Sequence, residues 1–230
     1  PYRLPNHVGK RLIDPHVVIV GAGASIAACE VDKNGKKVPS LKNIHIILGL
    51  TDELKKYNFS DEQMEDFEKL FSDINGKAEY RDLQKKLEYE VCDYFSKLQI
   101  PDEPTLYDYL ILSLTGKDAI ISFNWDPFLT QAYKRNICVG NLPELIFPHG
   151  NAGVGLCYDC KIKGYANCLC PKCFKELQQM PLLYPIGKKD YNSKPIIVNE
   201  WNLAKSVLSR AAGITVYGYS APVTAVSYTH

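Results

Sequence analysis

Two closely spaced cysteine pairs are the most specific chemical signal in the sequence. Cys157 and Cys160 are separated by two residues, and Cys170 and Cys173 repeat this spacing. A turn can present both sulfurs of such a pair, and two pairs can complete a tetrahedral zinc site. Four thiolates leave no position for water, so we expect a structural zinc ion. Cys168 could replace Cys170 as a ligand, and five reduced cysteines without metal are the alternative.

A glycine turn follows a β-branched run near the start of the chain. Residues 16–20 predict a buried parallel strand. The strand runs into Gly21, Ala22, Gly23, Ala24 and Ser25. Such a turn brings the backbone close to a phosphate, whose charge is met by N–H groups at the start of the next helix. A dehydrogenase fingerprint would place a third small residue where this chain has Ile26. A tight turn without a ligand is therefore the alternative to a phosphate site.

Polar residues also follow three further apolar runs. They are Asn124 and Asp126 after residues 119–123, His149 after residues 145–147, and Gly218, Tyr219 and Ser220 after residues 214–217. Because ligands bind where the carboxyl ends of parallel strands meet, we expect the four strand ends to share one crevice. An imidazole in this crevice can accept a proton near neutral pH. His149 could instead be structural, and Asn124 could cap the helix that begins near Pro127.

The stretches between these strand ends predict helices and loops. Apolar residues recur at helical spacing after a capping box formed by Ser60 and Gln63. Residues 30–43 are polar and indicate a loop, whereas residues 44–50 fit either a strand or a helix. We expect the helix before the last strand to end at Gly213.

Together these elements predict an α/β fold with a Rossmann-like parallel sheet. We expect a helical insertion or lid at about residues 51–116 and a small zinc-binding module at about residues 154–176. The 230 residues are 46% hydrophobic and 23% charged, which excludes disorder and is enough for one large domain or two small ones. We predict a single domain over residues 1–230.

Charge and cysteine usage bear on the partners of the protein. The net charge of +1 gives no bulk attraction to nucleic acid or to an anionic membrane. We expect no membrane segment, since the apolar runs are too short, and no signal peptide. Five of the eight cysteines crowd into one stretch, which suits a metal better than a disulfide framework. These features predict a cytoplasmic protein.

The order of the motifs resembles the sirtuin-like NAD-consuming domains. The glycine turn is followed by Phe123-Asn124-Trp125-Asp126, His149-Gly150, the two cysteine pairs and Gly218-Tyr219-Ser220. The stretch at 121–129 looks like bacterial sirtuin-like proteins, including NAD-hydrolysing effectors of antiphage defence. Deacylating sirtuins follow their glycine turn with Gly-Ile-Pro-Asp-Phe-Arg, where this chain has Ile26-Ala27-Ala28-Cys29-Glu30-Val31. The resemblance therefore favours hydrolysis over deacylation.

This resemblance implies roles for individual residues. Asn124 would hold the ribose or order the attacking water, His149 would accept a proton, and Asp126 would place the nicotinamide or ribose. The glycine turn, with Ser25, would contact the phosphates, and Gly218, Tyr219 and Ser220 would line the adenosine side. Bacterial relatives commonly carry an acidic residue where this chain has Ala225, and they continue into a further strand. A chain shortened at its C-terminus is therefore one expectation.

Three functions follow as hypotheses. The first is an NAD hydrolase that releases nicotinamide and ADP-ribose, serves antiphage defence, and is gated by homo-oligomerisation or by a sensor subunit. The second is an NAD-dependent protein deacylase. The third is a non-catalytic module whose NAD pocket senses and whose zinc hairpin binds protein or nucleic acid. The third hypothesis is permitted by four lysines near the cysteines: Lys161, Lys163, Lys172 and Lys175. We do not expect this chain alone to bind nucleic acid.

Overall fold

A four-stranded parallel sheet forms the centre of the computed structural model, which describes residues 14–184 and 194–219. The strands lie in the order β3-β2-β1-β7, with all pairings parallel. Their bounds are β1 (His16–Val20), β2 (Ala119–Ser122), β3 (Glu144–Ile146) and β7 (Gly213–Tyr217). Val20 at the end of β1 pairs with Ser122 of β2 and with Tyr217 of β7. The carboxyl ends therefore meet at one edge, which confirms the predicted parallel sheet.

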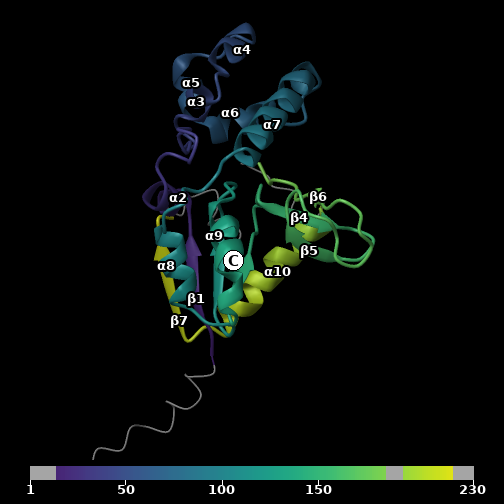
Figure 1. The fold of residues 1–230 in the computed structure, drawn as a ribbon. Helices are drawn as coiled ribbons and strands as arrows, with labels where there is room; N and C mark the ends of the chain where they lie inside the picture. Colours follow the sequence, from purple (N-terminus) through teal and green to yellow (C-terminus); the bar gives the residue numbers. More distant parts are fainter. Residues whose placement is uncertain (1–13, 185–193, 220–230) are drawn as a thin grey trace, which may run out of the picture.

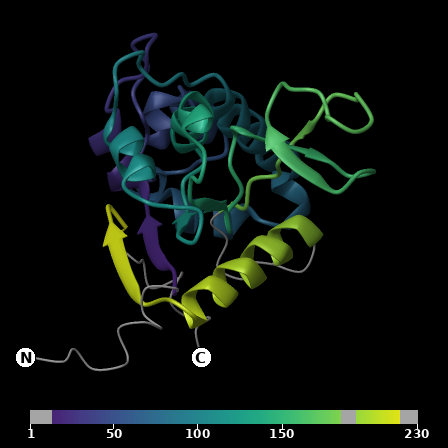
Figure 2. The ribbon, with the colours of Figure 1, turned by 60° about the horizontal axis from the view of Figure 1, so that its bottom comes forward.

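Helices cover both faces of this sheet (Figures 1 and 2). Side chains alternate between faces along β1, because successive residues of a strand point in opposite directions. Val17 packs with Ala204 and Val207 of α10 (Pro195–Ser209). The opposite face, which includes Val18 and Val20, joins a core shared with three other helices. These are α2 (Ala22–Ala28), α8 (Leu106–Leu112) and α9 (Phe128–Asn136), the last followed by η2 (Ile137–Val139).

A group of helices lies beyond the carboxyl edge of the sheet (Figure 1). They are α3 (Ile44–Ile47), α4 (Thr51–Lys56), α5 (Asp61–Glu65), α6 (Phe67–Ile74), η1 (Ala78–Tyr80) and α7 (Arg81–Ser96). Buried residues such as Phe67, Leu87 and Val91 continue the core of the sheet into this group. The α8 helix falls within the range predicted for the insertion and lies beside the sheet, where Asp108 pairs with Arg135 of α9.

The helix boundaries confirm some predictions and correct others. The capping box is present, because Ser60 Oγ accepts from Gln63 N at 3.2 Å and Ser60 N donates to Gln63 Oε1 at 2.9 Å. Residues 44–47, left open between strand and helix, form α3. The prediction that the helix before β7 ends at Gly213 is wrong. The helix ends at Ser209, and Gly213 is the first residue of β7, paired with His16.

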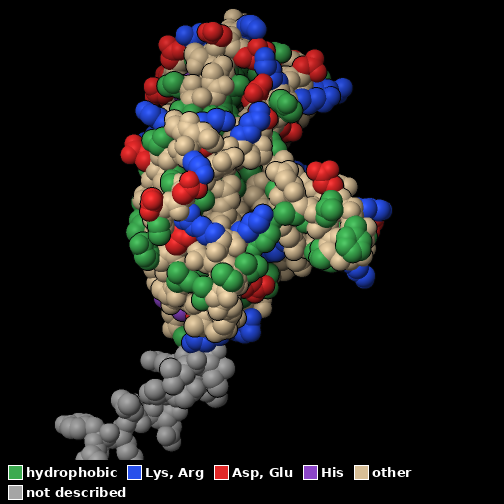
Figure 3. Space-filling model, in the orientation of Figure 1, with side chains coloured by type: hydrophobic (Ala, Val, Ile, Leu, Met, Phe, Trp, Pro, Cys, Tyr) green, Lys and Arg blue, Asp and Glu red, His purple; other side chains and the backbone are tan. Residues whose placement is uncertain are grey.

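A small antiparallel sheet protrudes from the side of the molecule (Figures 1 and 3). Its strands lie in the order β5-β4-β6, with bounds β4 (Val154–Cys157), β5 (Ile162–Tyr165) and β6 (Gln178–Gln179). Acidic and basic side chains are interspersed over the face seen in Figure 3. Within the two described ranges, no helix combines the length and apolar character needed to span a lipid bilayer.

Candidate functional site

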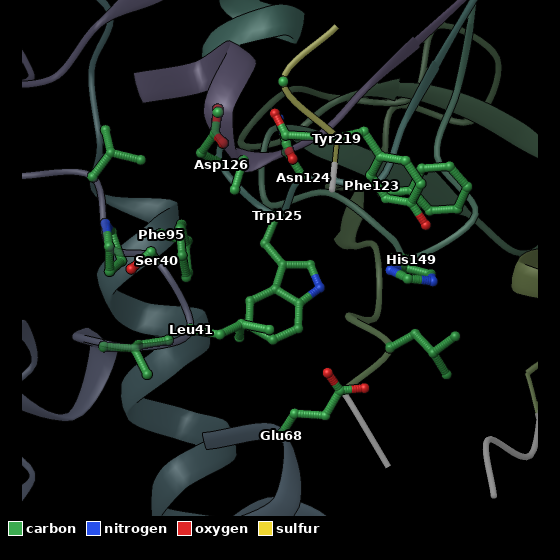
Figure 4. A pocket seen from close by; sticks show the side chains of 18 residues that line it. Ser40, Leu41, Glu68, Phe95, Phe123, Asn124, Trp125, Asp126, His149 and Tyr219 are labelled. Carbon is green, nitrogen blue, oxygen red and sulfur yellow. The ribbon is translucent and has the colours of Figure 1, made fainter. Parts of the chain in front are cut away.

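A cavity of about 530 Å³ lies where the strand ends face the helical group (Figure 4). The sequence-predicted residues that line it are Gly21, Ala22, Gly23, Asn124, Asp126, His149, Gly218 and Tyr219. Ala24 and Ser25 are fully buried and do not line it, and Ser220 lies outside the described residues. The structure thus brings together residues that follow β1, β2, β3 and β7 and are distant in the chain.

The glycine turn packs directly against the end of β7. Gly23 N donates to Gly218 O at 2.9 Å, and Ala24 N donates to Gly21 O at 2.9 Å. Gly218 has a φ of +60°, and a Cβ at this position would lie 2.0 Å from Ala24 N. Glycine is therefore required at 218 both by conformation and by close approach. Two of the N–H groups expected to meet a phosphate are bonded to backbone carbonyls in this structure.

Asn124 is anchored by its amide nitrogen. Nδ2 donates to Gly21 O and to Ser25 Oγ, each at 2.8 Å, and lies 3.2 Å from the hydroxyl of Tyr107. A backbone carbonyl can only accept, so Nδ2 must face Gly21. This leaves Oδ1 of a cavity-lining asparagine to accept from a ligand or a water. Asn124 does not cap α9: Asp126 Oδ1 accepts from Phe128 N at 3.2 Å instead.

Asp126 carries a buried carboxyl group. Its side chain is 3% exposed, and burial raises its pKa to about 6, against hydrogen bonds from the Ser25 hydroxyl and the Phe128 N–H that lower it. Among the described residues that line the cavity, none is a lysine or an arginine. The cavity therefore presents a carboxylate at neutral pH without a lysine or arginine among its described lining residues, an environment that favours a cationic group of a ligand.

Tyr107 completes the hydrogen-bond network under Asp126 and was missed by sequence reasoning. Its hydroxyl lies 2.7 Å from Ser25 Oγ, and burial raises the pKa of Tyr107 far above its usual value, so it stays protonated. Ser25 Oγ accepts from Asn124 Nδ2 at 2.8 Å, and the Ser25 hydroxyl lowers the pKa of Asp126. Ser25 is therefore buried behind the cavity wall, where it holds the Asn124 side chain. The available signal was a tyrosine near the start of a capped helix, since a buried phenol needs a partner.

His149 is held by aromatic contacts at one side of the cavity. Its ring centroid lies 4.8 Å from that of Phe123 in an edge arrangement, and 6.0 Å from that of Trp201. Tyr219 stacks on Phe123, with the two ring centroids 4.8 Å apart. The imidazole is half-buried and faces the cavity in Figure 4. It can therefore exchange protons with a ligand while its orientation is restrained by packing.

Asn151 is a second residue that the sequence reasoning missed. It is fully buried, and its Nδ2 donates to Asn124 O at 3.1 Å and to Asp126 O at 2.6 Å. Ala152 N adds a bond to Trp125 O at 2.8 Å. Because Asn151 follows His149 by two residues, one side chain links the loop after β2 to the loop after β3. No spacing rule in the sequence points to this contact.

The rest of the lining is mostly apolar. The helical group contributes Ile44, Glu68 and Phe95, and the loop before α3 contributes Val38, Pro39, Ser40 and Leu41. Leu183 also lines the cavity, and its N–H donates to His149 O at 2.9 Å. Trp125 lies beside Phe95 in the cavity (Figure 4), with their ring centroids 5.7 Å apart and their planes nearly perpendicular. The buried Trp125 Nε1 has no hydrogen-bond partner among the described residues. A planar, partly polar ring is the kind of ligand that such walls accommodate.

The four predicted zinc ligands form one cluster in the protruding module. The Sγ atoms of Cys157, Cys160, Cys170 and Cys173 all lie within 4.8 Å of one another. Thiolates around zinc at 2.3 Å are about 3.8 Å apart in a tetrahedron, so this donor set fits the ion. The N–H of Cys173 donates to the Cys170 sulfur and lowers the pKa of this thiol to about 6.

Cys168 lies outside the cluster. Its Sγ contacts Lys134 Nζ at 3.8 Å, whereas the sulfur of Cys170 lies in the cluster. When bound, zinc would crosslink the two ends of the module and serve folding, because four thiolates leave no open coordination position.

Comparisons with known proteins give a limited result. No protein-family model and no curated protein matches the chain. Among solved structures, a Sir2 homologue in complex with NAD matches with a TM-score of 0.48 and 16% identity, over 96% of this chain and 76% of that one. A Sir2 protein bound to acetylated peptide matches with a TM-score of 0.45 and 15% identity, over 98% and 82%. At this level of similarity, only the chain's own residues carry an argument about function.

Proposed function

We propose that this protein cleaves NAD between nicotinamide and ribose and releases nicotinamide and ADP-ribose. The observation that carries the proposal is the convergence of Asn124, Asp126 and His149 on one cavity of about 530 Å³, beside the glycine turn. The resemblance of the motif order to sirtuin-like NAD-consuming domains supports the same reaction. The cavity volume is in the range of small-molecule sites.

Cleavage of this bond needs little acid catalysis from the protein, because the leaving nicotinamide is already a cationic pyridinium. The C1′–N1 bond breaks, its electron pair passes to the cationic pyridinium nitrogen, and neutral nicotinamide leaves. Positive charge develops on the ribose, and a fixed carboxylate in a site of low dielectric stabilises it. Asp126, with a pKa of about 6, is ionised at neutral pH and would supply this charge. The aromatic wall at Trp125 and Phe95 would hold the nicotinamide ring.

Water then adds its oxygen to C1′ and loses one proton. We assign the ordering of this water, or of a ribose hydroxyl, to Asn124 Oδ1, since Nδ2 is occupied by Gly21 and Ser25. His149 would accept the proton, because its imidazole faces the cavity and histidine is the most frequent general base in enzymes. The turn at Gly21 to Gly23 and the Gly218 to Tyr219 segment would contact the rest of the dinucleotide.

Nicotinamide release from NAD by the purified protein is the direct test. His149→Ala and Asn124→Ala should lower the rate by about a hundredfold, the typical contribution of general acid–base catalysis. His16→Ala is the matched control, because His16 lies at the opposite end of β1 and contacts Thr215. Undiminished turnover in both site variants would remove the assignment. Release that requires an acylated peptide would favour the deacylase.

We further propose that the protein is an NAD-depleting effector of antiphage defence in the bacterial cytoplasm. Unchecked NAD loss would poison the cell, so the activity needs gating, and we assign this to homo-oligomerisation or to a sensor subunit. All eight cysteines are free, which supports a reducing compartment. NAD levels in cells during phage infection, with intact protein or with His149→Ala, test this role. Equal NAD levels in both would contradict it.

A further inference from the structure

The α10 helix carries a buried carboxylate beside the loop that holds His149. Glu200 is 1% exposed, and its Oε2 accepts from the backbone N–H of Phe147 at 2.7 Å. Phe147 precedes His149 by two residues, directly after β3. The next residue of α10, Trp201, packs its ring 6.0 Å from the imidazole. One turn of α10 thus restrains both the backbone that leads to His149 and the ring itself.

The protruding cysteine module supplies the cation for this carboxylate. Lys163, in the middle of β5, places Nζ 2.8 Å from Glu200 Oε1. The same Nζ donates to Leu145 O at 3.1 Å and lies 5.9 Å from the centroid of the Phe147 ring. Lys163 therefore contacts the end of β3 directly and through Glu200. In Figure 1, α10 passes between the parallel sheet and the β4–β5 hairpin, as these contacts require.

The contact between Glu200 and Phe147 depends on the ion pair between Glu200 and Lys163. A buried carboxylate that loses its cation is strongly destabilised, whereas a neutral pair of similar shape is often tolerated. Among the described residues, Lys163 is the cation that forms an ion pair with Glu200. Without Lys163, the ionised Glu200 side chain would move toward solvent. Its hydrogen bond from the Phe147 N–H would then be lost. The position of His149 would then change, although Lys163 lies outside the cavity.

We infer that Lys163 and Glu200 are positioning residues that hold His149 in place, and that the cysteine module thereby supports the catalytic loop. This inference rests on the proposed function of His149 in NAD cleavage. It gives the module a task beyond its own folding, because the hairpin that presents Cys157 and Cys160 also presents Lys163.

A double-mutant comparison tests the inference. Lys163→Met should lower kcat for nicotinamide release about tenfold or more, since a misplacement of about 1 Å can cost a hundredfold. KM for NAD should change much less. Adding Glu200→Gln should recover most of the loss, because the amide still accepts from Phe147 and no charge is left unpaired. Lys172→Met, an exposed lysine of the same module, is the matched control and should behave as wild type.

A second readout does not depend on activity. The imidazole signal of His149, assigned by NMR with His149→Ala, should move in Lys163→Met and return in the double variant. A Lys163→Met protein that is less stable but keeps the wild-type kcat and the wild-type His149 signal would overturn the inference. If the wild type releases no nicotinamide, the proposed function fails, while the NMR comparison still decides whether Lys163 and Glu200 position His149.

Discussion

Replacing Asp126 by asparagine should stabilise the protein while lowering nicotinamide release. The side chain is 3% exposed, and burial raises its pKa from about 4, the ordinary value of an aspartate, to about 6. At about 1.4 kcal/mol per pH unit, the ionised carboxylate costs the folded state up to about 3 kcal/mol at neutral pH. Asparagine has the same shape, and its Oδ1 can still accept from Phe128 N.

The sign of this effect depends on pH. Below about pH 4 the carboxyl is protonated in both folded and unfolded chains, so Asp126→Asn and wild type should be equally stable. As pH rises from about 4 to about 6, the unfolded carboxyl ionises first, and wild type loses stability relative to the variant. Above this range the difference should stay constant, near its maximum.

Thermal unfolding between pH 4 and 7.5 measures this difference. For a chain of this size, about 3 kcal/mol corresponds to a Tm increase of about 10 °C. Asp118→Asn is the matched control, because Asp118 is also buried. Burial alone would raise its pKa, but hydrogen bonds from His16 N and from Thr115 hold that pKa below the usual range. Asp118→Asn should therefore destabilise at neutral pH. A pH-independent difference, or an Asp126→Asn protein less stable than wild type at pH 7.5, would refute the reasoning.

Three further outcomes are expected. Tyr107→Phe removes the hydroxyl that is hydrogen-bonded to Ser25, and it should lower the free energy of unfolding by about 1 kcal/mol. It should also lower nicotinamide release, which the same assay measures. Gly218→Ala should lower the free energy of unfolding in urea by more than about 2 kcal/mol, because the new Cβ clashes with Ala24 and the backbone is left-handed. Gly35→Ala is the control, since its backbone is also left-handed but its surroundings are open. It should show only the smaller cost of the left-handed backbone. Cys170→Ser should reduce bound zinc well below about one ion per chain in elemental analysis, while Cys168→Ser should retain it, and equal zinc content in the two variants would contradict the ligand assignment.

Features that depend on a short stretch of chain could be predicted from the sequence. The strands β1, β2, β3 and β7 follow from β-branched and apolar runs, and the capping box at Ser60 follows from the spacing to Gln63. The cysteine cluster follows from two-residue spacings. The break between α5 and α6 could not be predicted in the same way. Asp66 interrupts the apolar spacing and accepts from Lys69 N at 3.0 Å, so it caps a new helix.

The support of the site required the tertiary structure. Tyr107 reaches Ser25 across 82 positions of the chain, Asn124 reaches Gly21 across 103, and Glu200 reaches Phe147 across 53. Buried polar atoms take whichever partner the packing places beside them, and periodicity carries no information about that choice. The same holds for Ser25, whose position in the glycine turn suggested a phosphate contact and whose hydroxyl faces the interior.

The amino-acid sequence alone determined which strand ends carry polar groups and where four thiolates could gather, because apolar period and residue spacing act over a few positions. Only the tertiary structure decided that three of the groups, Asn124, Asp126 and His149, face one cavity, and which buried partners hold them. The order of strands in the sheet and the packing of α10 against it set these contacts. Both depend on burial of surfaces that lie far apart along the chain.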